Sequence, residues 1–272
     1  MNVVNIFGLV RKVPTEWREL KKADALWLVA RFAHLLKPSY DFRLRFLMQL
    51  LNIQWWRFFT LKKLMNLPVE QISYMTGLVN WVFPIDKITL TTNFYKTKWV
   101  PFAKLIGPAD KLENLTLAEF SFADHYFRQY MATQDIIELD KLCAVLWRKK
   151  AAAVSVDTAE YKNDTRILFN SYAIKKNALR FKFTSKLFKF FVLMYFWGSR
   201  NVFVADYPNV FNGANDKKSA SLDIGWVSVM FELAGSKFGT LEETSKQDLT
   251  TILLYLENSL INIKNQKKND GN

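Results

Sequence analysis

The sequence predicts a mainly α-helical protein of several packed helices, and three observations carry that prediction. The 272 residues include only 9 Gly and 7 Pro, which is fewer turn residues than an all-β chain of this length uses. Apolar residues recur at spacings of three and four along most of the chain, as they do in helices with one buried face. Hydrophobic residues make up 50% of the chain, enough for a sizeable core.

The first half of the chain combines helices with a small β element. Its first dozen residues favour a strand or an extended arm. We expect helices in three segments that show the helical apolar spacing: 24–36, 42–65 and 69–82. The segment "DKITLTTNFYKTKWVP", residues 86–101, alternates and is rich in β-branched and aromatic residues. It predicts a small hairpin with its turn near Thr92 and Asn93.

The second half opens with two predicted helices. Thr116 and Glu119 have the spacing of a capping box, in which the threonine caps the helix and the glutamate reaches back to the cap. The next helix runs over residues 133–150 and turns Cys143 inward. Its last turn carries Arg148 and the two lysines that follow, which suits the negative end of a helix dipole.

The polar stretch 151–178 has little periodicity and predicts a long excursion of the kind that is often functional. Residues 186–197 follow and are apolar on every side, so they predict a central, surrounded helix that ends at Gly198. Residues 207–221 predict a polar loop.

The stretch "LAGSKFGTLEETSK", residues 233–246, raises the question of a phosphate site because it places a lysine between two glycines. A phosphate-binding loop needs four residues between its glycines and the lysine after them, following a strand. Here the preceding residues have the helical apolar spacing, at Ile224, Val227, Met230 or Phe231, and Ala234. The sequence "TLEE" then has the pattern of a capping box. We therefore predict a corner between two helices, with Phe238 and Leu241 filling it.

These elements suggest three regions. We expect an N-terminal helical region with a β element over residues 1–106, a helical domain over 107–264, and a disordered tail over 265–272. The N-terminal sequence does not resemble a signal peptide. The longest apolar run, residues 187–197, is too short to span a membrane, so we expect no membrane span.

The charge and the single cysteine suggest a class of partner and a compartment. The formal net charge of +13 favours nucleic acid or another acidic partner, although the basic residues are scattered in doublets without a long run. Trp55, Trp56 and Arg57 have two readings: a platform on which bases stack, or a wide buried stripe. A lone Cys143 excludes an intrachain disulfide and suits a reducing compartment.

Residues for catalysis or metal binding are few. Neither His34 nor His125 has a histidine or cysteine at ligand spacing, and no dinucleotide fingerprint or nucleophile motif is present in the sequence. Asp164 and Arg166, two residues apart in an extended segment, can form an ion pair on one face. The sequence thus predicts no enzyme and no cofactor.

Five phrases, taken in order, resemble a poorly characterised group of phage and prophage proteins from Bacteroidetes hosts. They are "GPADKLENLTLAEFSFADHYFRQY" (107–130), "LCAVLWR" (142–148), "DTRILFN" (164–170), "WGSRNVFVADYPNVF" (197–211) and "GWVSVMFELAGSKFG" (225–239). The group's "LYRP" is "LWRK" here, and the first hundred residues are not matched.

The resemblance implies a tail assembly or structural protein that acts through protein–protein association with other tail components or with itself. It also implies a location in the host cytoplasm during assembly or in the virion. As interface candidates we name Arg166, Arg200, Tyr207 and Phe211, because arginine and aromatic residues anchor many interfaces. The alternative is a basic nucleic-acid-binding protein that uses Trp55, Trp56 and Arg57.

Overall fold

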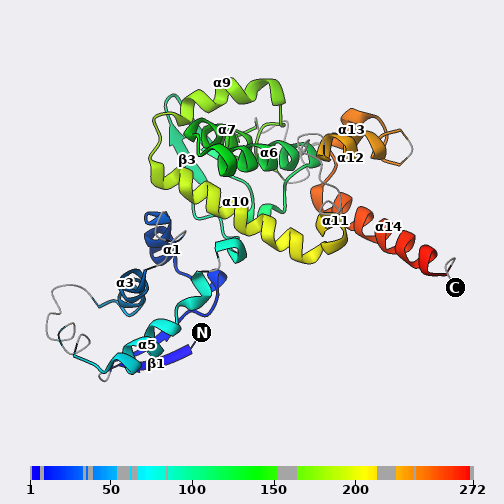
Figure 1. The fold of residues 1–272 in the computed structure, drawn as a ribbon. Coiled ribbons are helices and arrows are strands. Elements are labelled where there is room, and N and C mark those ends of the chain that lie inside the picture. The colour runs from blue at the N-terminus through cyan, green and yellow to red at the C-terminus, as the bar shows by residue number, and fades with distance from the viewer. Residues whose placement is uncertain are drawn as a thin grey trace. The chain divides into compact units, whose positions relative to one another are not determined.

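The computed structural model is mainly helical, as the sequence predicts (Figure 1). It describes residues 2–6, 9–32, 35, 39–53, 62, 66–83, 85–151, 164–212, 225–235 and 237–269. Contacts divide the chain into two compact units: Met1–Thr91 with Lys186–Asn201, and Thr92–Ser185 with Val202–Asn272. We expected the chain to divide near residue 106. Among the residues that the structure describes, no helix has both the length and the apolar character needed to cross a membrane.

The first unit contains a hairpin and several short helices. Its elements are β1 (Asn2–Ile6), β2 (Leu9–Val13), α1 (Lys22–Val29), α3 (Tyr40–Leu50), α5 (Val69–Gly77) and the 3-10 helices Trp17–Glu19, Asn80–Val82 and Ile85–Lys87. β1 and β2 pair antiparallel. Trp27 of α1 stacks on Phe42 and Phe46 of α3, with ring centroids 5.5 and 5.7 Å away. These aromatic contacts hold α1 against α3.

The helix predicted over 42–65 is shorter in the part that the structure describes. Ser39 caps α3 by accepting a hydrogen bond from the amide of Phe42 at 3.1 Å. The helix ends at Leu50, and Asn52 adopts a left-handed conformation with φ 54°. A left-handed residue terminates a helix because it turns the chain away from the helical path. Trp55, Trp56 and Arg57 lie outside the described residues.

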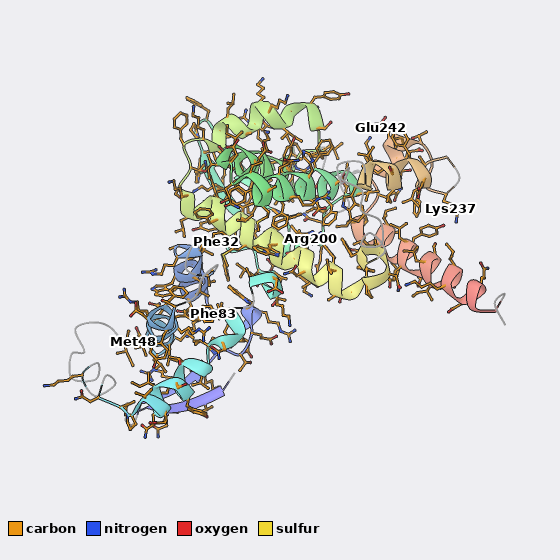
Figure 2. All side chains as sticks on the ribbon, in the orientation of Figure 1. Phe32, Met48, Phe83, Arg200, Lys237 and Glu242 are labelled. Carbon is orange, nitrogen blue, oxygen red and sulfur yellow. The ribbon has the colours of Figure 1, made fainter. Side chains whose placement is uncertain are left out.

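Helix α10 (Lys186–Asp206) continues through Gly198, where the sequence predicted its end. Gly198 serves a close approach instead: a Cβ there would lie 2.4 Å from the backbone nitrogen of Leu90. One turn further on, the side-chain amide of Asn201 donates to the carbonyls of Asp86 and Ile88, at 2.8 Å each. Phe190 of α10 stacks on Phe32, labelled in Figure 2, at 5.3 Å. The glycine is therefore a packing residue and not a cap.

The second unit contains a three-stranded antiparallel sheet in the order β3-β4-β5. The strands are β3 (Thr97–Val100), β4 (Ala103–Ile106) and β5 (Arg148–Lys149). The hairpin predicted over 86–101 is thus displaced toward the C-terminus. Val100 pairs with Ala103, so Pro101 and Phe102 form the turn, and Phe102 has φ 63°. Glycine usually holds such a position, and its absence hides the turn from the sequence. Asn93, where the turn was predicted, is buried and donates to the carbonyl of Pro108 at 2.8 Å.

Helices make up most of the second unit. They are α6 (Leu117–Thr133), α7 (Ile136–Leu146), α9 (Ile174–Ala178), the end of α10, α11 (Pro208–Asn212), α12 (Gly225–Leu233), α13 (Leu241–Ser245), α14 (Leu249–Asn269) and the 3-10 helices Asp110–Leu112, Ser171–Ala173 and Leu179–Phe181. α7 packs against both α6 and α9, and Cys143 is fully buried on it, as predicted. Gln134, with φ 59°, and Asp135, which caps α7, form the tight α6–α7 connection.

Helix α14 is held at its start and near its middle. The amide of Leu117 donates to the carbonyl of Gln247 at 2.9 Å, and the amide of Leu249 donates to the carbonyl of Leu115 at 3.0 Å. Further along, the buried Glu257 accepts hydrogen bonds from the first amides of α11. α14 then continues as a helix to Asn269, through part of the segment from 265 that the sequence predicts to be disordered.

Candidate protein-binding groove

A pocket of about 1120 Å³ lies in the second unit. Its lining comes from the start of α6, the extended segment 164–172, α12 and α13. We call this pocket the groove. Its floor is a cluster of ion pairs, and large apolar side chains are exposed along its rim. The floor and the rim are built from different parts of the chain.

The floor of the groove is a buried cluster of two carboxylates and two guanidinium groups. Glu119 lies 2.7 Å from Arg148 and 3.1 Å from Arg166. Asp164 lies 3.3 Å from Arg148 and 2.7 Å from Arg166, which confirms the predicted Asp164–Arg166 ion pair. The cluster carries two positive and two negative charges, so its net charge is zero.

Glu119 reaches this cluster because the predicted capping box forms only in part. The hydroxyl of Thr116 accepts a hydrogen bond from the amide of Glu119 at 3.3 Å, as expected. The carboxylate of Glu119 does not return to the cap; it turns to the two arginines instead. A charged partner is a stronger attraction for a buried carboxylate than a neutral amide.

Arg148 joins the floor because α7 ends earlier than predicted. The helix stops at Leu146, and Arg148 pairs with Ile106 as part of β5. The sequence placed Arg148 in the last turn of that helix, whereas it lies in a strand and its side chain is 5% exposed. Burial lowers the pKa of Arg148 from its ordinary value, and the negative charge of Glu119 opposes that shift.

Arg166 connects separate segments of the unit. Its guanidinium donates to the carbonyl of Leu146 at 2.9 Å and to the carbonyl of Asn114 at 3.2 Å, in addition to its two carboxylate partners. The backbone around it also pairs with the strand after α7, through an isolated bridge to Lys150. These bonds fix the segment 164–172 as one wall of the groove.

Large apolar side chains form the rim and are exposed. The segment 164–172, α12 and α13 each contribute: Ile167 (37% exposed), Leu168 (40%), Tyr172 (96%), Val227 (41%), Phe231 (62%) and Leu241 (40%). Of the residues whose spacing predicted this helix, Met230 is buried, whereas Val227 and Phe231 are exposed. Residues 226–234 are apolar on more than one side of α12, and the helix can bury only one of them.

The wall formed by α12 is anchored to α6 through Trp226. The indole N–H of Trp226 donates to the carboxylate of Asp124 at 3.1 Å, and Arg128 forms an ion pair with the same carboxylate at 3.2 Å. The Trp226 ring meets the rings of Phe120 and Phe211 edge-on, with centroids 5.2 and 5.7 Å away. With its inner face held in this way, α12 presents Val227 and Phe231 outward.

The stretch 233–246 forms the predicted helix corner. Gly235 and Gly239 have φ 88° and 78°, and the capping box between Thr240 and Glu243 is complete. The hydrogen bonds from the amide and hydroxyl of Thr240 lower the pKa of Glu243. Lys237, labelled in Figure 2, donates to the hydroxyl of Tyr255.

The lysine and both glycines of this corner thus have roles other than binding phosphate. Phe238 fills the corner against Tyr255, with ring centroids 5.2 Å apart, whereas Leu241 is exposed on the groove rim. The prediction that Leu241 fills the corner was wrong.

The four interface candidates have different positions. Arg166 is 1% exposed, so it supports the groove from below and cannot anchor a partner at the surface. Phe211 and Tyr207 are half-buried; Phe211 packs on Trp226, and burial raises the pKa of Tyr207. Arg200, labelled in Figure 2, is half-buried and belongs to the first unit, whereas the other three belong to the second. Of the four, Arg166 alone lines the groove.

The groove is acidic within a basic protein. Among the described residues that line it are six acidic and three basic side chains, which gives a net charge of −3: Glu113, Glu119, Asp164, Glu242, Glu243 and Asp248, against Arg148, Arg166 and Lys246. The whole chain carries +13. The floor is neutral, so the excess negative charge belongs to the rim, where Glu242 is 75% exposed and Glu113 is 66% exposed.

Comparison with protein-family models, curated proteins and solved structures gives no match. The groove itself is therefore the basis for a functional argument.

Proposed function

We propose that this chain acts by binding other protein chains and that the groove is the binding site. The observation that carries the proposal is the rim: six large apolar side chains from three elements stay exposed around one pocket. Apolar contacts surrounded by polar residues are typical of the centre of a protein interface. The anchored walls favour binding further, because a preformed site loses little conformational entropy when its partner arrives.

The chemistry of the floor favours binding over catalysis. Both carboxylates there are held by arginines, and Arg166 also donates to two backbone carbonyls. A general acid or base needs a group that is able to exchange its proton near neutral pH. Arginine side chains stay protonated near neutral pH, and both carboxylates of the floor are engaged in ion pairs with them. The cluster thus serves as a rigid support.

We further propose that the partners are components of a phage tail during its assembly in the host cytoplasm. The support is the ordered set of phrases that resembles phage tail morphogenesis proteins. Those phrases include Glu119, Arg148, Asp164 and Arg166 of the floor, and also Val227 and Phe231 of the rim. Most of the residues that line the groove thus lie within the phrases that carry the resemblance.

The test is co-expression of the chain with the products of its neighbouring genes. We expect the wild-type chain to form a stable complex. Phe231→Glu should abolish the complex, because it places a charge among the apolar side chains of the rim. Phe183→Glu is the matched control, because Phe183 is 80% exposed and lies outside the groove. Equal recovery of the complex with both variants would contradict the proposal.

Nucleic-acid binding is the second candidate, and the net charge of +13 is the observation that favours it. The groove does not support this function, because its negative rim repels phosphate. The nucleic-acid-binding candidate therefore rests on the positive charge elsewhere on the chain, together with Trp55, Trp56 and Arg57.

A further inference from the structure

We propose that the occupant of the groove is the C-terminal end of α14 from a second copy of this chain. The inference rests on the proposed function, since it names the protein that the groove binds. Three observations lead to it: the exposure of that end, its charge, and its distance from the groove of its own chain.

The end of α14 lacks the burial that its start has. Leu249, Ile252 and Leu253 are buried, whereas residues 261–266 are all exposed. Two of the exposed residues are large and apolar: Ile261 is 38% exposed and Ile263 is 47% exposed. Residues two apart in a helix lie on different sides, and Ile261 instead shares its side with Leu254, seven residues earlier and 54% exposed. An exposed helical end that carries branched apolar side chains suits binding in a groove, a common way for one chain to recognise another.

The charges of the two surfaces are opposite. From Asn258 to Asn269 the sequence contains Lys264, Lys267 and Lys268 and no acidic residue. The described lining of the groove carries −3. Lys264 also donates to the side-chain oxygen of Asn209 in its own chain. A basic helical end that presents Leu254 and Ile261 on one side therefore matches the groove in both polarity and charge, and such complementarity selects partners and speeds their encounter.

The helix cannot deliver its end to the groove of its own chain. Asp248, just before α14, lines the groove, and the helix then rises roughly 18 Å from Leu249 to Ile261 at about 1.5 Å per residue. The end of α14 consequently points away from α12 and α13, as the red helix in Figure 1 shows. Because α14 is one continuous helix, only another copy can supply this end to the groove.

A contact of this kind joins two different surfaces, and each copy offers one of each. It therefore propagates: the second copy has a vacant groove of its own, and the first has a vacant helix end. Head-to-tail contacts generate a ring when the rotation closes and a filament when it does not. Either product is compatible with a structural component of a larger assembly.

The test measures the mass of the full chain by light scattering or sedimentation over a range of concentrations. We expect oligomers whose mean mass rises with concentration. Phe231→Glu in the groove and the double variant Ile261→Glu/Ile263→Glu at the helix end should each weaken self-association at least about thirtyfold, the loss typical of a central interface residue. Phe183→Glu should associate like the wild-type chain.

Mixing the two variants gives the decisive result. The groove variant retains its helix end and the end variant retains its groove, so an equimolar mixture should form a 1:1 dimer and nothing larger. A mixture that stays monomeric, or an end variant that associates like the wild type, would overturn the inference. Glu242→Lys provides a second groove variant if Phe231→Glu fails to fold, and it should weaken association because the incoming end is basic.

The same measurements separate this inference from the proposed function. If the wild-type chain is monomeric but its complex with neighbouring gene products is lost in Phe231→Glu, the groove binds a different protein, and only the inference fails. If neither self-association nor complex formation depends on Phe231, both fail.

Discussion

The carboxylate of Glu119 lies where arginines from two distant parts of the chain meet. Arg148 follows α7 and Arg166 belongs to the segment 164–172, and each is within 3.1 Å of this one side chain. A buried ion pair adds modest stability when it is complete, but it is costly to break because the remaining charges lose their compensation. Here the removal of one negative charge leaves two guanidinium groups with one carboxylate.

We therefore predict that Glu119→Gln lowers the free energy of unfolding by about 3–5 kcal/mol. The measurement is urea-induced unfolding of the full chain. The matched control is Asp41→Asn, which breaks the exposed ion pair with Arg45 (2.8 Å). Its expected cost is below about 1 kcal/mol, because water replaces a surface ion pair almost fully. Similar costs for the two variants would mean that the cluster does not hold the groove floor.

At the scale of elements, α10 contains a glycine that is required because another segment of backbone passes close to the helix. Alanine is ordinarily the better residue in a helix interior by about 1 kcal/mol. At Gly198 the added methyl group would meet the backbone of Leu90 at 2.4 Å, and backbone cannot rotate away as a side chain can. At Gly225, the first residue of α12, the same methyl group would meet nothing within 4 Å of the described chain.

We expect Gly198→Ala to destabilise the protein by about 1–3 kcal/mol, the usual cost of overpacking. Gly225→Ala should be neutral or stabilising by up to about 1 kcal/mol. Thermal unfolding of the two variants beside the wild type gives the comparison. A stabilised Gly198→Ala variant would show that α10 and the backbone at Leu90 are not in close contact.

Local patterns in the sequence predicted those elements whose formation depends on neighbouring residues. The helix corner at 233–246 is an example, because its glycines and its capping box act within a few residues of each other. Glu119 could not be placed in this way: its local pattern predicts a capping box, and the arginines that draw it away are distant in sequence. Arg148 was misplaced for the same reason, since its strand exists only through pairing with Ile106.

The groove was less predictable from sequence than the helices. Arg166 was singled out as an interface residue and lines the floor, but the sequence could not show that it is buried there. Val227, Phe231 and Tyr172 carry the proposed binding surface and were not chosen. Apolar periodicity marks which residues suit burial, and it cannot show which of two apolar faces of a helix such as α12 lacks a covering element. Apolar residues on more than one side of a short helix were the available signal.

At the scale of the whole molecule, the charge of +13 and the groove's −3 favour different classes of partner. A scattered positive charge attracts any polyanion, and salt weakens that attraction because bound phosphates release counterions. A groove that binds a protein through apolar contacts should be far less sensitive to salt. The salt dependence of binding thus separates the two candidate functions.

We predict weak, non-specific DNA binding, with a dissociation constant in the micromolar range or weaker near physiological salt and a steep loss as salt rises. Fluorescence anisotropy with a labelled duplex at several salt concentrations measures it. Phe231→Glu should leave the DNA affinity unchanged, because DNA binding is not expected to use the groove. Tight binding that is lost in Trp55→Ala or Arg57→Ala would instead favour the nucleic-acid-binding alternative.

The position of α10 in the chain also affects when each unit is complete during synthesis. Its residues 186–201 count with the first unit, although residues 92–185 of the second unit precede them in the chain. During synthesis, the first unit must therefore wait for residue 201 to leave the ribosome, while much of the second unit has already emerged. Neither unit corresponds to an uninterrupted stretch of the gene, so a cut between Thr91 and Thr92 leaves the first fragment without residues 186–201, which belong to its unit.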